Sequence, residues 1–131
     1  MILADTDVLI DYLMGTQPIA IQVLEYSESE TLQTSAITCF ELLSGAKEGK
    51  RGDKVRHLVA TIPVLPLDRE AATRAAAVRQ QLTSSGFSIA MADSLIAGIA
   101  LANGLPLLTR NRKHFEHVDG LRVLALGESA G

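Results

Sequence analysis

The chain opens with Met1-Ile-Leu-Ala-Asp-Thr-Asp-Val-Leu-Ile-Asp-Tyr-Leu-Met-Gly15, in which a short apolar run leads into a helical segment. Residues 1–4 predict a strand, and residues 6–14 predict a helix that Gly15 closes. The rest of the chain also alternates short apolar runs with longer helical ones, which predicts β/α units around a parallel sheet. Because the connections are short, we expect a three-layer α/β/α sandwich whose central parallel sheet has about five strands.

The remaining elements are expected to follow the same pattern. Strands are predicted at residues 31–35, 62–67, 106–109 and 121–126. Helices are predicted in a segment that begins near Pro18 and at residues 36–46, 53–61, 68–83 and 88–103. Asp68 and Ser88 are the expected N-caps of the last two helices. The stretch Gly49-Lys-Arg-Gly52 is expected to be a turn.

Length and composition place limits on the class of protein. At 131 residues the chain is expected to form a single domain over residues 1–131, with a core of Leu, Ile, Val and Ala because aromatic residues are only 4%. The single Cys39 cannot form an internal disulfide, which fits a reducing, cytoplasmic setting. Asp5, Asp7 and Asp11 do not fit a signal peptide, and no apolar run reaches the roughly 18 residues that span a bilayer, so we expect no membrane contact.

The net charge of −3 argues against a protein that coats nucleic acid generally, but it does not exclude a nuclease with local basic clusters. Two such clusters are present: Lys47, Lys50, Arg51, Lys54 and Arg56, and then Arg110, Arg112, Lys113 and His114. Each cluster is either a solvated surface or a phosphate-binding one, and the sequence leaves both interpretations open.

Carboxylates interrupt the most apolar stretches of the chain. Asp5 and Asp7 lie in the first of these stretches, Glu41 in Ile37–Leu43 and Asp93 in Ile89–Ala102. An unpaired buried carboxylate costs several kcal/mol or becomes protonated, and no Lys or Arg lies within these runs. A shared divalent cation is the simplest partner, so metal-dependent chemistry is the first hypothesis.

The expected elements bring these acids to one end of the sheet. Asp5 follows the first strand, Glu41 is in the second turn of a helix, Asp93 is in the first turns of another, and Asn111 follows a strand. Ligands of such sheets bind at the carboxyl ends of the strands. Mg²⁺, with Mn²⁺ as a substitute, prefers oxygen ligands of this kind.

Simpler roles remain open for the same residues. Asp5 or Asp7 could cap the first helix, Glu41 could face solvent and Asn111 could be a turn residue. Nothing has zinc spacing, because there is one Cys and the three His residues are not expected to pair with the acids.

Four segments carry a resemblance to a known family: Leu3-Ala-Asp-Thr-Asp-Val-Leu-Ile-Asp11, Ser35-Ala-Ile-Thr-Cys-Phe-Glu-Leu-Leu-Ser-Gly45, Ala92-Asp-Ser-Leu-Ile-Ala97 and Pro106-Leu-Leu-Thr-Arg-Asn-Arg-Lys-His-Phe115. In this order and at these separations they resemble PIN-domain ribonucleases, and closely the VapC-type toxins of bacterial toxin–antitoxin pairs. The resemblance implies a PIN-like fold. It also implies that Asp5, Glu41 and Asp93 are catalytic metal-site acids and that Thr6 and Thr109 line the pocket.

The same resemblance bears on cofactor, substrate and partners. Asn111 stands at a fourth metal-site position that is often Asp, so it is a possible ligand whose missing charge weakens the case for a second metal. The implied activity is Mg²⁺-dependent cleavage of RNA, such as tRNA or another structured RNA, leaving 5′-phosphate and 3′-hydroxyl ends. Flanking phosphates would contact basic residues of the two clusters: Lys50, Arg51, Arg110, Arg112 and Lys113.

Protein partners are implied as well. The family pattern suggests a homodimer and a cognate VapB-like antitoxin that occupies the cleft. Apolar residues on the first two helices are expected to line an exposed groove for such a partner: Leu9, Tyr12, Leu13, Ile21 and Leu24.

Two rival functions compete with a nuclease. Asp5-Thr-Asp7 also resembles the start of haloacid-dehalogenase-type phosphatases, in which the first Asp is a nucleophile. That family needs a downstream Lys and a later paired acidic motif, which Ala92-Asp-Ser-Leu95 does not supply. The second rival is a catalytically inactive PIN-like scaffold, against which the retained Asp5, Glu41 and Asp93 argue.

Overall fold

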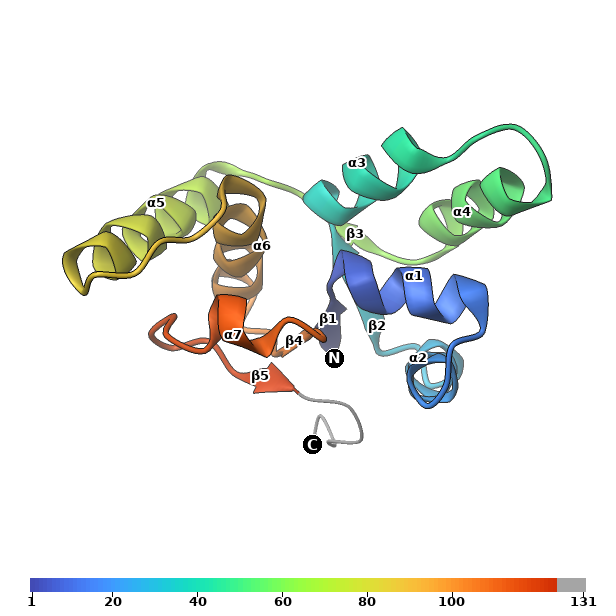
Figure 1. The fold of residues 1–131 in the computed structure, drawn as a ribbon, viewed down its shortest axis with the longest axis horizontal. Helices are drawn as coiled ribbons and strands as arrows, with labels where there is room; N and C mark the ends of the chain where they lie inside the picture. The colour runs from blue at the N-terminus through green and yellow to red at the C-terminus, as the bar shows by residue number, and fades with distance from the viewer. Residues whose placement is uncertain (125–131) are drawn as a thin grey trace.

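In the computed structural model, which describes residues 1–124, five short parallel strands form one sheet in the order β3-β2-β1-β4-β5 (Figure 1). The strands are β1 (Ile2–Ala4), β2 (Leu32–Ser35), β3 (Val64–Leu65), β4 (Leu107–Leu108) and β5 (Val123–Leu124). The predicted parallel sheet is confirmed, although most strands are shorter than expected. Residues 125–126 of the predicted last strand lie outside the described residues.

Seven helices of the described chain cover the two faces of the sheet. They are α1 (Thr6–Met14), α2 (Ile19–Glu28), α3 (Ala36–Gly45), α4 (Lys50–Thr61), α5 (Arg69–Ser84), α6 (Met91–Ala102) and α7 (Arg112–Phe115). Successive side chains of a strand point to opposite faces. Accordingly, Ile2 and Ala4 pack with α1, α2 and α4, whereas Leu3 packs with α5, α6 and α7. The three layers are visible in Figure 1, and the predicted sandwich is confirmed.

Local signals account for several helix ends. Gly15 ends α1 with a φ of 71°, a conformation that favours glycine, and the Asp68 side chain caps α5 by accepting from the Ala71 N–H at 2.9 Å. The predicted turn at 49–52 is wrong, because α4 already begins at Lys50. Gly52 permits this start, since a Cβ there would overlap the Lys47 carbonyl oxygen.

Two further predictions for the second half of the chain need correction. Ser88 does not cap α6, which begins at Met91 after Ala90 and has no side-chain cap. The short helix α7 was not predicted, because four residues are too few to show a periodic pattern. No helix formed by residues 1–124 is long and apolar enough to cross a membrane.

The helices α5 and α6 pack so closely that the position of α6 is tightly fixed. A Cβ at Gly98 would overlap the Ala71 carbonyl oxygen and crowd Ala75, so only glycine allows this approach. The two helices are built of small residues at the contact, which brings their backbones together. Asp93, in the first turn of α6, is thereby held on a rigid element.

Candidate active site

The candidate site lies at the carboxyl ends of the central strands, where the chain switches from one side of β1 to the other. Asp5 follows β1 directly, caps α1 and is only 5% exposed. One of its carboxylate oxygens accepts a hydrogen bond from the Thr6 backbone N–H at 2.8 Å. The other accepts from Thr109 Oγ1 at 2.8 Å. The capping role considered for Asp5 is therefore real, but it uses only one oxygen.

The environment of Asp5 disfavours its charge. Burial raises its pKa from 3.8 to about 6, and the charges of Asp7 and, to a smaller extent, Asp93 act in the same direction. The hydrogen bonds from Thr109 and Thr6 lower the pKa but do not offset the burial. Asp5 is thus a carboxylate that lacks a positive partner within the described chain.

Thr6 connects Asp5 to Glu41, because its backbone N–H donates to Asp5 and its hydroxyl donates to Glu41. Thr6 Oγ1 donates to Glu41 Oε1 at 2.7 Å, and it lies 3.0 Å from Thr38 Oγ1. Thr38 is fully buried and its backbone N–H donates to the Ser35 side chain, the N-cap of α3, at 3.0 Å. Glu41 itself is exposed, as the simpler interpretation required, yet Thr6 holds its carboxylate toward β1.

Asp93 lies in the first turn of α6 and is half-buried. Burial raises its pKa, His114 lowers it through charge and a hydrogen bond, and the Glu41 charge raises it. His114 Nδ1 is 3.1 Å from Asp93 Oδ2. The expectation that no His pairs with the acids is wrong for His114, because the unpredicted helix α7 brings it to Asp93.

Arg110, which lies outside the apolar runs, contacts Asp7 and Asp11 of α1. The Arg110 backbone N–H donates to Asp7 Oδ2 at 3.0 Å, and its Nε lies 3.0 Å from Asp11 Oδ2. Burial raises the pKa of Asp7, and the hydrogen bond from the Arg110 N–H opposes this effect by lowering that pKa. The Oδ1 atom of Asp7 is buried without a hydrogen-bond partner among the described residues. Arg110, predicted to contact RNA, is thus already engaged by two carboxylates.

The remaining predicted pocket residues lie around the same point. Thr109 is buried and its hydroxyl faces Asp5 at 2.8 Å and Asp7 at 3.5 Å. Asn111 is exposed, and its backbone N–H donates to Thr109 Oγ1 at 3.0 Å, while its side chain makes no capping bond to α7. The structure therefore places Thr6 and Thr109 against Asp5, and the Asn111 backbone against Thr109.

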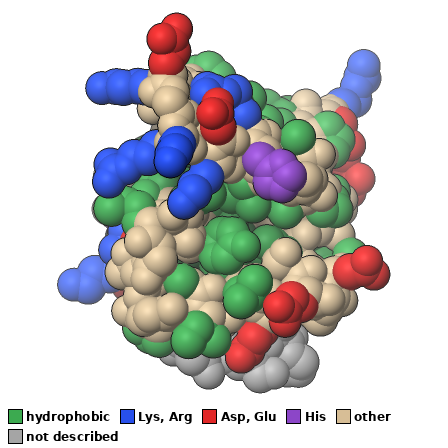
Figure 2. Space-filling view, turned by 90° about the vertical axis from the view of Figure 1, so that its right-hand side faces the viewer, with side chains coloured by type: hydrophobic (Ala, Val, Ile, Leu, Met, Phe, Trp, Pro, Cys, Tyr) green, Lys and Arg blue, Asp and Glu red, His purple; other side chains and the backbone are tan. Residues whose placement is uncertain are grey.

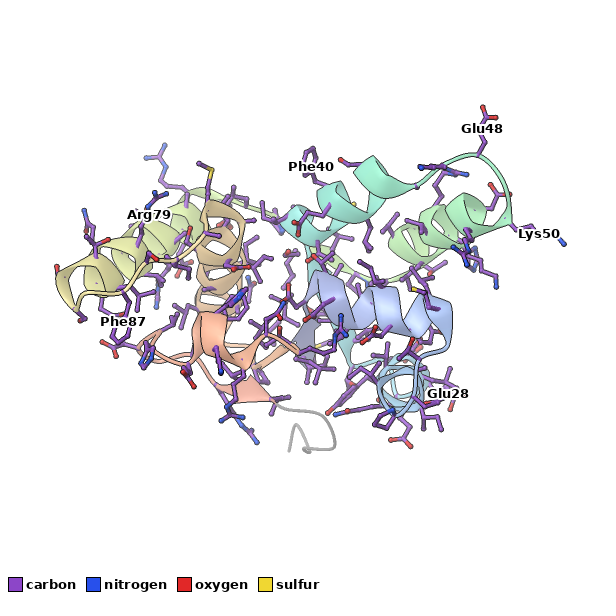
Figure 3. The ribbon with its side chains drawn as sticks, in the orientation of Figure 1. Glu28, Phe40, Glu48, Lys50, Arg79 and Phe87 are labelled. Atoms are coloured by element: carbon purple, nitrogen blue, oxygen red, sulfur yellow. The ribbon has the colours of Figure 1, made fainter. Side chains whose placement is uncertain are left out.

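The predicted basic residues lie on two elements. Arg112 and Lys113 are exposed on α7, one and two residues beyond Asn111. Arg51 and Lys54 on α4 join Glu41 in lining a pocket of about 450 Å³ between α1, α3 and α4. Lys50 stands at the outer end of α4, where Figure 3 shows it pointing away from the sheet.

The three predicted metal-site acids share this end of the sheet without forming a closed ligand set. Asp93 contributes to the raised pKa of Asp5, and Glu41 contributes to that of Asp93, so each lies within electrostatic range of a neighbour. Within residues 1–124, no three His, Cys, Asp or Glu side chains are close enough to hold a metal together. Their joint ligation stays a prediction.

The chemistry of the donors nevertheless fits a hard cation. All three acids offer oxygen atoms, and in the described chain neither Asp5 nor Glu41 forms an ion pair with Lys or Arg. Mg²⁺ and Mn²⁺ take such ligands, and their charge would remove the repulsion that raises these pKa values. The sequence did not identify Thr38 or His114 as part of the site. A hydroxyl inside the apolar run before Glu41 was the available signal for Thr38.

Comparison with known proteins agrees with this architecture. A sequence profile described as PIN domain matches residues 2–121. The chain is 34% identical over 93 residues to tRNA(fMet)-specific endonuclease VapC of Shigella flexneri, covering 68% of this chain and 70% of the relative. It is 32% identical to Ribonuclease VapC1 of Methanocaldococcus jannaschii, covering 93% of this chain and 85% of that protein. A chain of DNA-bound VapBC from Salmonella typhimurium superposes with a TM-score of 0.79 at 27% identity, covering 95% of this chain and 98% of that one.

The chain therefore belongs to the PIN domain family, in its VapC group.

Proposed function

We propose that the protein is a Mg²⁺-dependent endoribonuclease that acts as the toxin of a toxin–antitoxin pair. The observation that carries this proposal is Asp5, a buried carboxylate at a strand tip whose pKa is raised to about 6 and which has no cationic partner in the described chain. Glu41 is hydrogen-bonded to Thr6, the neighbour of Asp5, and Asp93 lies within electrostatic range of Asp5; buried acids with raised pKa values, such as Asp5 and Asp93, often mark functional sites. The named activities of the Shigella and Methanocaldococcus relatives support the same function.

Asp5 and Asp93 would hold the ion, with Glu41 completing the set and Asn111 as a possible further ligand. A bound Mg²⁺ supplies a more acidic water and neutralises charge on the scissile phosphate. Asp5 is fixed by hydrogen bonds from Thr6 and Thr109, so its oxygens need no reorganisation. Glu41, oriented by the Thr6 hydroxyl at 2.7 Å, would accept a proton from the attacking water.

Attack by water accounts for the expected products. Within the described part of the chain, Glu41 and Asp93 are assigned to the ion and the attacking water, and His114 is assigned to Asp93, so no side chain beside Asp5 is assigned to activate the ribose 2′-hydroxyl. Cleavage would therefore leave a 5′-phosphate and a 3′-hydroxyl. Arg112 and Lys113 on α7, with Arg51 at the pocket beside Glu41, would contact flanking phosphates of a tRNA or another structured RNA.

The face formed by α1, α2 and α4 supports an antitoxin as partner. A pocket of about 710 Å³ there is lined by Tyr12, Leu13 and Leu24, with Lys54 and His57 among its polar residues. Figure 2 shows apolar side chains at the centre of this face and Lys and Arg side chains above them. An amphipathic helix of a VapB-like antitoxin fits such a groove.

The pocket differs from the predicted groove in two residues, because neither Leu9 nor Ile21 lines it. Leu9 is fully buried in the core, and Ile21 is 54% exposed but lies outside the pocket lining, whereas Leu24 is 42% exposed and lines it. The Salmonella structure is described as DNA-bound VapBC, which supports a partner of this kind for the present chain. A homodimer remains part of the proposal.

The test compares RNA cleavage by the purified parent protein with cleavage by Asp93→Asn, in Mg²⁺, Mn²⁺ and EDTA. The 5′ ends of the products are captured by ligation, which requires a 5′-phosphate. Asp119→Asn is the matched control, because Asp119 is exposed in the loop after α7. We expect cleavage by the parent and the control in either metal and none by Asp93→Asn.

Equal cleavage by Asp93→Asn and the parent in both metals would refute the mechanism. A parent protein that binds an antitoxin but cuts no RNA would instead favour the inactive scaffold, for which the absence of a closed three-ligand group within residues 1–124 is the motivating observation.

A further inference from the structure

Helix α7 presents a histidine to the acid site while its own position is fixed by the core. Phe115 is fully buried and packs in the core layer formed with α5 and α6. Its neighbour His114 is 56% exposed and reaches Asp93 on α6. The His114 backbone N–H donates to the Asn111 carbonyl at 2.9 Å, which fixes the first turn of α7. The ring is thus held over Asp93 by a buried anchor on one side and a short turn on the other.

The chemistry of the contact determines which group donates. An ionised carboxylate only accepts hydrogen bonds, so the Nδ1 atom that lies 3.1 Å from Asp93 Oδ2 must carry the proton. This bond occupies Oδ2, and no described residue forms a hydrogen bond with Oδ1. The carboxylate therefore has one oxygen engaged and one available.

The two other acids of the site are oriented in the same manner. Asp5 accepts from the hydroxyl of Thr109, and Glu41 accepts from the hydroxyl of Thr6. Both donors come from a different element than the acid that they orient. His114 completes this arrangement, because it gives Asp93 a donor from α7.

We propose that His114 is a positioning residue that orients the Asp93 carboxylate so that Oδ1 is presented to the metal ion. This inference rests on the proposed function, since it assigns His114 a role toward the ion that Asp93 would bind. His114 is not itself a ligand in this assignment. Groups that orient a metal's ligands in this way typically change metal affinity by about 10-fold to 100-fold when they are removed.

A purely structural role accounts poorly for the contact. The pair is largely exposed on the His114 side, and exposed pairs stabilise a fold by about 0–1 kcal/mol. The attachment of α7 to the core is already provided by Phe115, which is fully buried. Removal of His114 should therefore change metal binding much more than stability.

The experiment measures Mn²⁺ binding to the whole chain by electron paramagnetic resonance, together with the melting temperature. His114→Ala should raise the Kd for Mn²⁺ by about tenfold or more and leave the melting temperature nearly unchanged. His114→Asn retains an N–H donor close to the position of Nδ1 and should recover part of the affinity. His117→Ala is the matched control, because His117 stacks on Phe87 with ring centroids 4.0 Å apart and does not contact Asp93.

RNA cleavage provides a second measurement. With His114→Ala, the Mg²⁺ concentration for half-maximal rate should rise, while the rate at saturating Mg²⁺ stays close to that of the parent. A Kd for Mn²⁺ within about twofold of the parent would overturn the positioning role, as would an equal loss in His117→Ala. A parent protein that binds no Mn²⁺ would overturn both the proposed function and the role of His114. If the parent binds Mn²⁺ and cleaves RNA while His114→Ala binds Mn²⁺ equally well, only the role of His114 is overturned.

Discussion

The buried acids of α1 and of its N-cap differ in their partners. Asp11 and Asp5 are similarly hidden, at 6% and 5% exposure. Asp11, together with Asp7, faces the guanidinium of Arg110, whose Nε is 3.0 Å from Asp11 Oδ2. Among residues 1–124, Asp5 receives hydrogen bonds only from a hydroxyl and a backbone N–H. Burial alone therefore does not separate a structural acid from a functional one.

The difference lies in whether the fold supplies a positive charge. Where Arg110 is present, the acids join the loop after β4 to α1, which is a structural task. At Asp5, where the described residues supply no positive charge, the folded protein retains a carboxylate whose pKa is raised to about 6. Such unfavourable charge is kept where a ligand or ion later compensates it. Each prediction below tests whether the two groups differ in this manner.

The largest expected difference concerns RNA cleavage by two isosteric variants. Asp5→Asn should lower kcat by about a hundredfold or more, because losing a ligand costs at least as much as losing a group that orients one. Asp11→Asn should stay within about threefold of the parent, since its carboxylate faces Arg110. Cleavage rates at saturating Mg²⁺ check this. Comparable losses in both variants would show that the two acid groups are functionally alike.

The second prediction concerns the contribution of Arg110, the partner of Asp7 and Asp11, to the stability of the fold. Arg110→Ala leaves Asp7 and Asp11 buried without a positive partner and should lower the free energy of unfolding by about 2 kcal/mol, less than for a fully buried pair because Arg110 is 49% exposed. Urea denaturation at pH 7 measures it, with Lys113→Ala as the control for losing a positive charge nearby. An Arg110→Ala protein as stable as Lys113→Ala would mean that the Arg110 contacts do not stabilise the fold.

The sequence predicts the fold well because its signals are local and repeated. Short apolar runs of β1 and β4, the helix stop at Gly15 and the cap at Asp68 are all visible in a few residues. Helix α7 was missed because four residues show no period, and the start of α6 was misplaced because no side chain caps it. Local chemistry thus predicts the elements, whereas their ends depend on packing.

The site was predictable to a different degree. The acids could be found because carboxylates are out of place in apolar runs, and parallel strands bring their carboxyl ends together. The partners of Asp11 and Asp93 could not be found, because the side-chain directions of Arg110 and His114 depend on the path of the loop after β4. A basic cluster on a loop predicts RNA contacts and intramolecular ion pairs equally well.

The third prediction uses the pH dependence of stability. The pKa of Asp5 is about 6 in the folded protein, against an ordinary value of 3.8. Between pH 4 and pH 6, the folded protein therefore binds more protons than the unfolded chain does. The contribution of Asp5 to stability is therefore fully present below about pH 4 and is lost as the pH rises through about 6. Asp5→Asn should gain up to about 3 kcal/mol relative to the parent at pH 7 and nothing near pH 4.

Thermal unfolding of the parent and Asp5→Asn across pH 4–7.5 tests this prediction. The Asn amide can donate to Thr109 Oγ1, and the Thr109 hydroxyl can turn to Asp7 Oδ2 at 3.5 Å, so the substitution preserves the local hydrogen bonds. Asp11→Asn is the control, because it removes a similarly buried carboxylate that faces Arg110. A constant difference between Asp5→Asn and the parent at all pH values would contradict the raised pKa.

The smallest expected effect is stabilisation by Mg²⁺. An ion that binds only the folded protein adds about 1 kcal/mol at a free concentration five times its Kd, and it should do so more strongly above pH 6, where Asp5 is ionised. Asp5→Asn should lose the stabilisation by Mg²⁺, although without metal it is more stable than the parent. Arg110→Ala should keep the stabilisation by Mg²⁺, although without metal it is less stable than the parent. Melting temperatures with Mg²⁺ and with EDTA measure both. The crossed pattern matters more than its size, because a nonspecific ionic effect would shift all three proteins alike. If Arg110→Ala lost the Mg²⁺ response and Asp5→Asn kept it, the ion would bind at the α1 acids, and the roles assigned to the two groups would be reversed.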